Sequence, residues 1–404
     1  MRSPFLYETL RRFCLGAFAV FHRDFDAGAS LPFAFEEHGS YGRPTLYEYR
    51  PLVRGFVEAR TERLYERDDV RAAVDDLRRE PAARIFARAH EGGAPDDARA
   101  LYRSVLVPLL VRTAEGCGGF DWDDRAFDRA YAELEAALFG DGHSYGAVAP
   151  VVGVSCGAAI DLGDGIRVRV AAAGELAAMW PEAAGLLPRD FGREPDRLCV
   201  LELERTLDRG AREVPDAPGE LADAVTALRL ATAAPLAAGP VLFERLDWRP
   251  YGIRPVLPIA ATPPPGEPTR LDPFRGSVAA KLRPQLEVAD DDARLGDALD
   301  RWELSLFQDD PFRREQLRQA LDAALGEGAG PWAAAMRGAA LLGETGRERV
   351  ELAELLHAPT ADLVRRLLVA LLLHGGRARL LRELDEALLG LGAGPARVAE
   401  LRAS

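Results

Sequence analysis

Apolar residues recur at helical spacing through most of the chain, most clearly in its last quarter. Two segments there, 294–308 and 312–325, share the i, i+3, i+4, i+7 spacing of an amphipathic helix. Two further helix-length segments follow at 332–342 and 347–356. A fifth segment, 360–374, is apolar on nearly all sides from Leu367 onward. An all-round apolar helix is typical of the centre of a bundle, so we predict a C-terminal helical bundle.

The first third of the chain predicts further amphipathic helices, which cover residues 6–17, 53–64, 70–77, 98–113 and 125–138. Between the first two of these lies an aromatic-rich loop that contains Phe33, Phe35, Tyr41, Tyr47 and Tyr49. Exposed aromatic rings would stack on bases or contact a partner. We favour burial against the helical core, because large apolar groups usually pack.

The middle of the chain changes to short runs rich in Val, Ile and Leu, which predict strands at 148–155, 165–171, 197–204, 241–246 and 256–260. Helices are expected at 173–184 and 220–230, and Leu162 to Gly165 predicts a hairpin turn. The predicted fold is therefore α+β and predominantly helical. Its expected parts are a helical region at 1–140, a mixed α+β domain at 141–290 and the bundle at 291–404.

Composition indicates a soluble globular protein of two or three domains, with 404 residues, 48% hydrophobic and 28% charged. The net charge of −13 argues against broad duplex binding, which needs a basic surface, but it leaves room for a local arginine-lined groove. The apolar run at 13–21 lacks the features of an export signal, and no run is long enough to span a membrane. We expect a cytoplasmic protein.

The four cysteines, Cys14, Cys117, Cys156 and Cys199, show no C-x-x-C spacing. This pattern predicts free thiols in a reducing compartment rather than a zinc site or a disulfide framework. Neither a metal nor another cofactor is expected.

Residues 295–376 resemble the HEPN superfamily, and most closely the C-terminal HEPN modules of ApeA-type bacterial defence proteins. The resemblance lies in ALDRWELSLFQDD at 298–310, Asp322 within QALDAAL, MRGAALLG at 336–343 and LLLHGG at 371–376. It implies a bundle that forms a homodimer or binds a partner protein. It also implies that a histidine and an arginine from two protomers meet at the dimer interface and cut RNA without metal.

The arginine of that motif is displaced in this chain. In the family it lies five to seven residues before the histidine, but here those positions hold leucine and valine. The nearest arginines before His374 are Arg366 and Arg365. An arginine eight residues back stands about 80° from His374 and roughly 12 Å along the helix axis. Only an arginine of a second protomer could share a phosphate with His374.

Two functions stay open for the bundle. The displaced motif favours a non-catalytic interaction or dimerisation module of a bacterial defence or nucleic-acid-associated system. The alternative is a metal-independent endoribonuclease, in which His374 transfers protons and Arg366 or Arg365 holds the phosphate, with Asp322 as the acid of the motif. As a structural residue, His374 would simply end its helix before Gly375 and Gly376.

Three weaker candidates lie in the middle of the chain. Ser155 matches the G-x-S-x-G pattern of a hydrolase nucleophile, but a hairpin follows it where the motif requires a helix. His143 could be half of an acid–base site, but no partner is visible, and a lone histidine in a glycine-rich loop is usually a surface residue. Glu202 and Glu204 lie on one face of a strand and could pair as carboxylates, although an exposed edge strand is the favoured interpretation.

Overall fold

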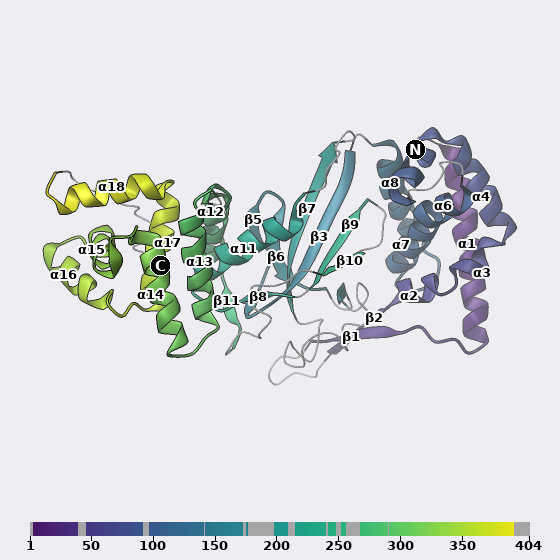
Figure 1. Ribbon diagram of the computed structural model, residues 1–404. Helices are drawn as coiled ribbons and strands as arrows, with labels where there is room; N and C mark the ends of the chain where they lie inside the picture. The colour runs from purple at the N-terminus through teal and green to yellow at the C-terminus, as the bar shows by residue number, and fades with distance from the viewer. Residues whose placement is uncertain are drawn as a thin grey trace.

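The computed structural model describes most of the chain: residues 3–38, 46–91, 97–140, 142–172, 175–176, 198–208, 215–239, 241–247, 252–255, 267–289 and 291–391. Across these residues the fold is α+β and predominantly helical, which confirms the predicted class. Figure 1 shows three parts in a row, with the N-terminal helices at one end, a twisted sheet in the middle and the C-terminal helices at the other end.

The N-terminal part is built around the long helix α1 (Pro4–Asp26), whose apolar stripe is fully buried. The other elements packed with it are α2 (Val53–Glu58), α3 (Thr61–Tyr65), α4 (Asp68–Arg79), α5 (Pro81–Glu91), α6 (Ala98–Leu101), the π-helical turn η1 (Tyr102–Leu106), α7 (Val107–Cys117) and α8 (Asp124–Phe139). Their buried side chains form a core separate from that of the rest of the chain.

The aromatic-rich stretch expected as a loop is instead an antiparallel hairpin of β1 (Phe33–His38) and β2 (Leu46–Pro51). Phe33 is exposed, so the predicted burial is wrong for this residue. Tyr41 lies outside the described residues, as do the side chains of Phe35, Tyr47 and Tyr49.

The middle part is a sheet with strand order β10-β9-β3-β7-β6-β5, and β8 also pairs with β3. The strands are β3 (Gly142–Val152), β5 (Ile160–Gly163), β6 (Ile166–Val170), β7 (Cys199–Asp208), β8 (Ala237–Ala238), β9 (Val241–Leu246) and β10 (Gly252–Pro255). The predicted hairpin is present as the antiparallel pair β5–β6. The expected strand at 256–260 lies outside the described residues, as does the helix at 173–184 apart from residues 175 and 176.

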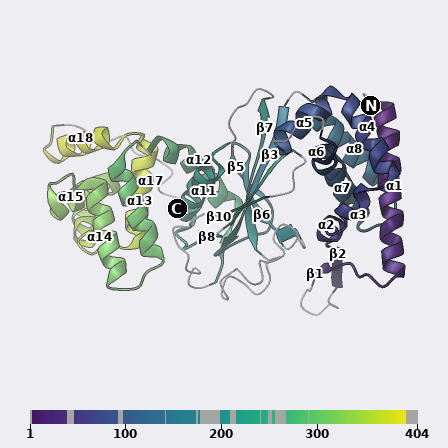
Figure 2. The ribbon, with the colours of Figure 1, turned by 45° about the vertical axis from the view of Figure 1, so that its right-hand side comes forward.

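Two helices, α11 (Ala217–Thr232) and α12 (Pro273–Ala289), lie between the sheet and the C-terminal bundle (Figure 2). A second, parallel strand pair joins β4 (Val154–Cys156) to β11 (Thr269–Leu271), which leads directly into α12. The sequence pattern did not predict α12. The expected boundaries at residues 140 and 290 fall directly after α8 and α12.

The bundle contains α13 (Ala293–Leu306), α14 (Phe312–Leu325), α15 (Gly330–Leu342), α16 (Gly346–Leu355), α17 (Ala361–His374) and α18 (Arg377–Leu388). Helix α17 is buried along most of its length, as its all-round apolar character predicts. The Thr360 side chain accepts from the Leu363 amide at its start, and Gly375 ends it in a left-handed conformation. The bundle shares one continuous hydrophobic core with the sheet and its helices.

Candidate functional site

His374 is the last residue of α17 and lies inside the turn to α18. Its Nε2 lies 3.1 Å from Oε2 of Glu383 and donates to it, since a carboxylate only accepts. The imidazole is 11% exposed. Its Nδ1 is buried and finds no hydrogen-bond partner among the described residues. The histidine therefore connects two helices and offers little of its ring to a substrate.

Glu383 is itself held from two sides. Arg379 Nε donates to its Oε1 at 2.8 Å, and His374 donates to the other oxygen. The hydrogen bond from Arg379, and to a smaller extent the one from His374, lowers the pKa of Glu383 below its usual value. The carboxylate thus stays ionised and keeps a negative charge beside His374.

Arg365 is a structural residue of the bundle. Its side chain is 5% exposed, and two of its nitrogens donate to Oδ1 of Asp362, at 3.0 and 2.8 Å. The third nitrogen, Nη1, donates to the Leu230 carbonyl of α11 at 3.0 Å. Arg365 thereby ties the central helix of the bundle to a helix of the sheet layer.

Arg366 is half-buried and differs from Arg365 in its contacts. No hydrogen bond or ion pair engages its guanidinium within the described part of the chain. Because α17 is a regular helix from Ala361 to His374, Arg366 keeps the predicted offset of roughly 12 Å along the axis from His374. One chain alone does not bring the two side chains together.

Asp322 lies near the C-terminal end of α14, half-buried. Its Oδ1 is buried without a hydrogen-bond partner in the described residues. This oxygen packs closely on Gly326, because a Cβ added at Gly326 would lie only 2.2 Å from it. Nearby, Arg337 Nη1 donates to the Leu325 carbonyl at 2.7 Å. Across the described ranges, no hydrogen bond or ion pair joins Asp322 to His374, Arg365 or Arg366.

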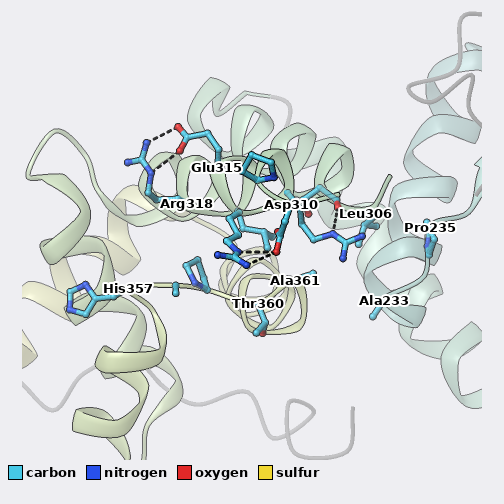
Figure 3. Close-up of a pocket in the computed structure, with 16 residues that line it drawn as sticks. Ala233, Pro235, Leu306, Asp310, Glu315, Arg318, His357, Thr360 and Ala361 are labelled. Atoms are coloured by element: carbon cyan, nitrogen blue, oxygen red, sulfur yellow. Dashed lines mark hydrogen bonds and ion pairs between the residues drawn. The ribbon is translucent and has the colours of Figure 1, made fainter. Parts of the chain in front are cut away.

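A groove of about 820 Å³ opens between α14, the segment before α17 and the turn after α11. Figure 3 shows its lining, with His357 at one end and Ala233 and Pro235 across from α14. Three arginines line it: Arg313, Arg314 and Arg318. This is the local arginine-lined groove that the composition left room for, but arginine is too common in the chain for the sequence to locate it.

The arginines of this groove are already engaged. Arg314 donates two bonds to Asp310 Oδ2, at 2.9 and 2.7 Å, and Arg318 donates two to Glu315, at 3.1 and 2.7 Å. These pairs are solvent-exposed, and exposed ion pairs are worth only about 0–1 kcal/mol. An anionic ligand can therefore exchange for the carboxylates at small cost.

The structure supplies the partner that the sequence left open for His143. Asp247 lies 104 residues away, and its Oδ2 is 2.8 Å from Nδ1 of His143. The Asp247 side chain is 1% exposed, and its second oxygen accepts from the Ser144 amide at 2.8 Å. A buried carboxylate in this position fixes the orientation of the imidazole. Nothing described beside the pair identifies a nucleophile or a substrate.

Two other expectations concern the sheet. Ser155 lies on β4, and the hairpin predicted after it follows, so the requirement for a strand–turn–helix context fails.

Placing Glu202 on an exposed edge was wrong, because β7 lies between β3 and β6. Glu202 is buried and accepts from Arg167 Nε at 2.5 Å and Arg169 Nε at 2.8 Å. The strand tolerates the buried carboxylate because two guanidinium groups neutralise it.

Comparisons with known proteins give no match: no family model, no curated protein and no solved structure resembles the chain significantly. In the described ranges, no group of three or more His, Cys, Asp or Glu side chains is arranged to hold a metal ion. None of the described helices is long and apolar enough to cross a membrane.

Proposed function

We propose that the C-terminal bundle, α13 to α18, is a non-catalytic interaction module that pairs with a second copy of this chain. One observation carries the proposal: two of the residues expected to perform chemistry, Arg365 and His374, hold the fold together. Arg365 and His374 are 5% and 11% exposed and are bound to Asp362 and Glu383. A proton-transfer group and a phosphate-holding cation must reach their substrate. The resemblance to HEPN modules supports a bacterial defence or nucleic-acid-associated setting.

Helix α16 supplies a surface for such pairing. None of its side chains is buried, and Val350 and Leu355 are 62% and 59% exposed. Trp332, at the start of the neighbouring helix α15, is exposed as well. Exposed large apolar groups on adjacent helices favour an interaction surface, and twofold dimers are the commonest oligomers. We therefore place the dimer contact at α15 and α16.

Light scattering after size-exclusion chromatography tests the dimer. We expect the wild-type chain to have the mass of two copies, and the double variant Val350→Asp/Leu355→Asp to have the mass of one. The control is Phe5→Asp, which changes a more exposed apolar residue on α1 and should leave the dimer intact. A monomeric wild-type chain, or a double variant that stays dimeric, contradicts the proposed contact.

The second candidate function is a metal-independent endoribonuclease. The observation that favours it is the Arg366 guanidinium, which no hydrogen bond or ion pair engages among the described residues. In a dimer, Arg366 of one protomer would approach His374 of the other, and the exposed arginine groove would hold the RNA backbone. This function predicts RNA cleavage in EDTA that is lost in Arg366→Ala. The control Arg79→Ala, which removes a largely exposed arginine on α4, away from the proposed dimer contact, should keep that cleavage.

A further inference from the structure

Two cysteines that are distant in the sequence lie in contact beside the sheet. Cys156 ends β4, and Cys199 begins β7. Their Sγ atoms are 3.6 Å apart. Cys199 is fixed in the sheet, where its register partners are Val151 of β3 and Val170 of β6, whereas Cys156 belongs to the separate β4–β11 pair. The thiol contact therefore bridges two strand systems.

We propose that Cys156 and Cys199 are a peroxide-reactive dithiol that closes to a reversible disulfide. The sulfur atoms need to approach by only about 1.5 Å to reach the S–S bond length of about 2.05 Å. β4 is three residues long, and the exposed residues Ser155 and Gly157 flank Cys156. A short strand of this kind can shift by that distance more easily than β7, which is paired on both sides.

The two thiols differ in exposure and in pKa, as a reactive and a resolving cysteine should. Cys156 is partly exposed, and Cys199 is buried. A hydrogen bond from the Cys199 thiol lowers the pKa of Cys156 to about 7, while the same contact and burial raise the pKa of Cys199. Because the thiolate is the reactive form, Cys156 is the attacking sulfur and Cys199 the resolving one.

The reaction balances with a hydroperoxide as oxidant. The Cys156 thiolate attacks one peroxide oxygen, so that an S–O bond forms, the O–O bond breaks and the other oxygen leaves as water or an alcohol after protonation. The Cys199 sulfur then attacks Cys156, so that the S–S bond forms and the S–O bond breaks. The proton of Cys199 goes to the departing hydroxide, which leaves as water. The two sulfurs lose two electrons in total, and the peroxide gains them.

The disulfide would link the sheet to the strand pair that leads into the bundle. β11 pairs with β4 at Cys156 and passes directly into α12, which packs on α11 and β5 and also contacts α17. The reduced chain has only the thiol contact at this position. Oxidation would therefore fix the entry of α12 covalently to β7.

The test treats the folded full-length protein with hydrogen peroxide, then alkylates the free thiols and identifies the products by mass spectrometry. We expect a Cys156–Cys199 disulfide, with Cys156 reacting about tenfold faster than Cys117, whose pKa is raised by burial. Cys199→Ser should trap Cys156 as a sulfenic acid that dimedone labels. Cys156→Ser should leave Cys199 reduced, and Cys14→Ala/Cys117→Ala should still form the disulfide.

Three outcomes would overturn the proposal. The first is that all four thiols stay free while the protein is folded. The second is that Cys156 reacts no faster than Cys117. The third is that the disulfide forms only after denaturation. Reduction of the product by dithiothreitol, with recovery of the original thiol count, is expected and shows that the disulfide is reversible.

Discussion

At the scale of single residues, a buried ion pair joins the sheet layer to the bundle. Arg229 Nη1 of α11 lies 2.5 Å from Glu303 Oε2 of α13, and both side chains are 2% exposed. The remaining groups are also satisfied, because Arg229 Nε donates to the Leu236 carbonyl and Thr226 donates to Glu303. Removing one partner leaves an uncompensated buried charge.

Glu303→Ala should therefore lower the free energy of unfolding by about 3–5 kcal/mol. The double variant Arg229→Met/Glu303→Leu replaces both charges with apolar groups of similar size and should cost clearly less. Urea unfolding of the three proteins measures the difference. Equal losses of unfolding free energy in the single and double variants would contradict the burial of this pair.

Contacts of this kind explain which residues the sequence could and could not place. The end of α17 at His374 was predictable, because Gly375 and Gly376 follow it directly. The burial of Arg365 was not, because one of its acceptors is the Leu230 carbonyl, 135 residues away. The Asp247 partner of His143 is similarly remote. Local pattern identifies a residue's position on its helix, whereas its contacts depend on how distant segments meet.

At the scale of elements, the end of α17 depends on one glycine. Gly375 has φ +75°, which an L side chain adopts only with strain, whereas Gly376 has φ 170°, which any residue adopts. Neither has an atom within 4 Å of an added Cβ. Gly375→Ala should lower stability by about 1 kcal/mol, and Gly376→Ala should be near neutral. Equal melting temperatures for the two variants would contradict this account.

The β6–β7 pair makes a pH-dependent contribution. Burial alone would raise the pKa of Glu202, but hydrogen bonds from Arg169 and Arg167 outweigh burial and lower it. Because the folded-state pKa is below the unfolded value of about 4.3, the ionised carboxylate stabilises the fold above that pH. This stabilisation is lost as the pH falls through the folded-state pKa.

The urea midpoint of wild type should therefore fall more steeply below pH ~4.3 than that of Glu202→Gln. The control is Glu204→Gln, which changes a partly exposed carboxylate two residues along the same strand. It should follow the wild-type curve closely. A Glu202→Gln curve parallel to wild type would show that the two arginines do not hold the carboxylate in its ionised form.

Most long helices were predictable because their apolar positions repeat, whereas α12 and the β1–β2 hairpin lacked such a signal. Helix α12 carries Pro284 in its interior, and proline normally argues against a helix. The β1–β2 hairpin lies in a stretch whose aromatic residues suggested only a loop packed on the core. In both places, pairing with neighbouring segments determines the structure more than the local pattern does.

At the scale of the whole molecule, the arrangement of cores separates the N-terminal helices from the rest. Those helices bury their own set of side chains, whereas the sheet, α11, α12 and the bundle share one core. The predicted domain boundaries gave no sign that the middle domain and the C-terminal bundle would share one core. Arg365 and the Arg229–Glu303 pair both lie where these parts meet, which supports a structural use of the bundle's buried charges.

We propose that His374 stabilises the fold and takes no part in RNA cleavage. The most direct measurement is an RNA cleavage assay in EDTA that compares the purified wild-type chain with His374→Ala. We expect equal, background-level cleavage by both proteins. Cleavage by the wild type that is lost in a folded His374→Ala protein would contradict it and would establish the bundle as a metal-independent ribonuclease.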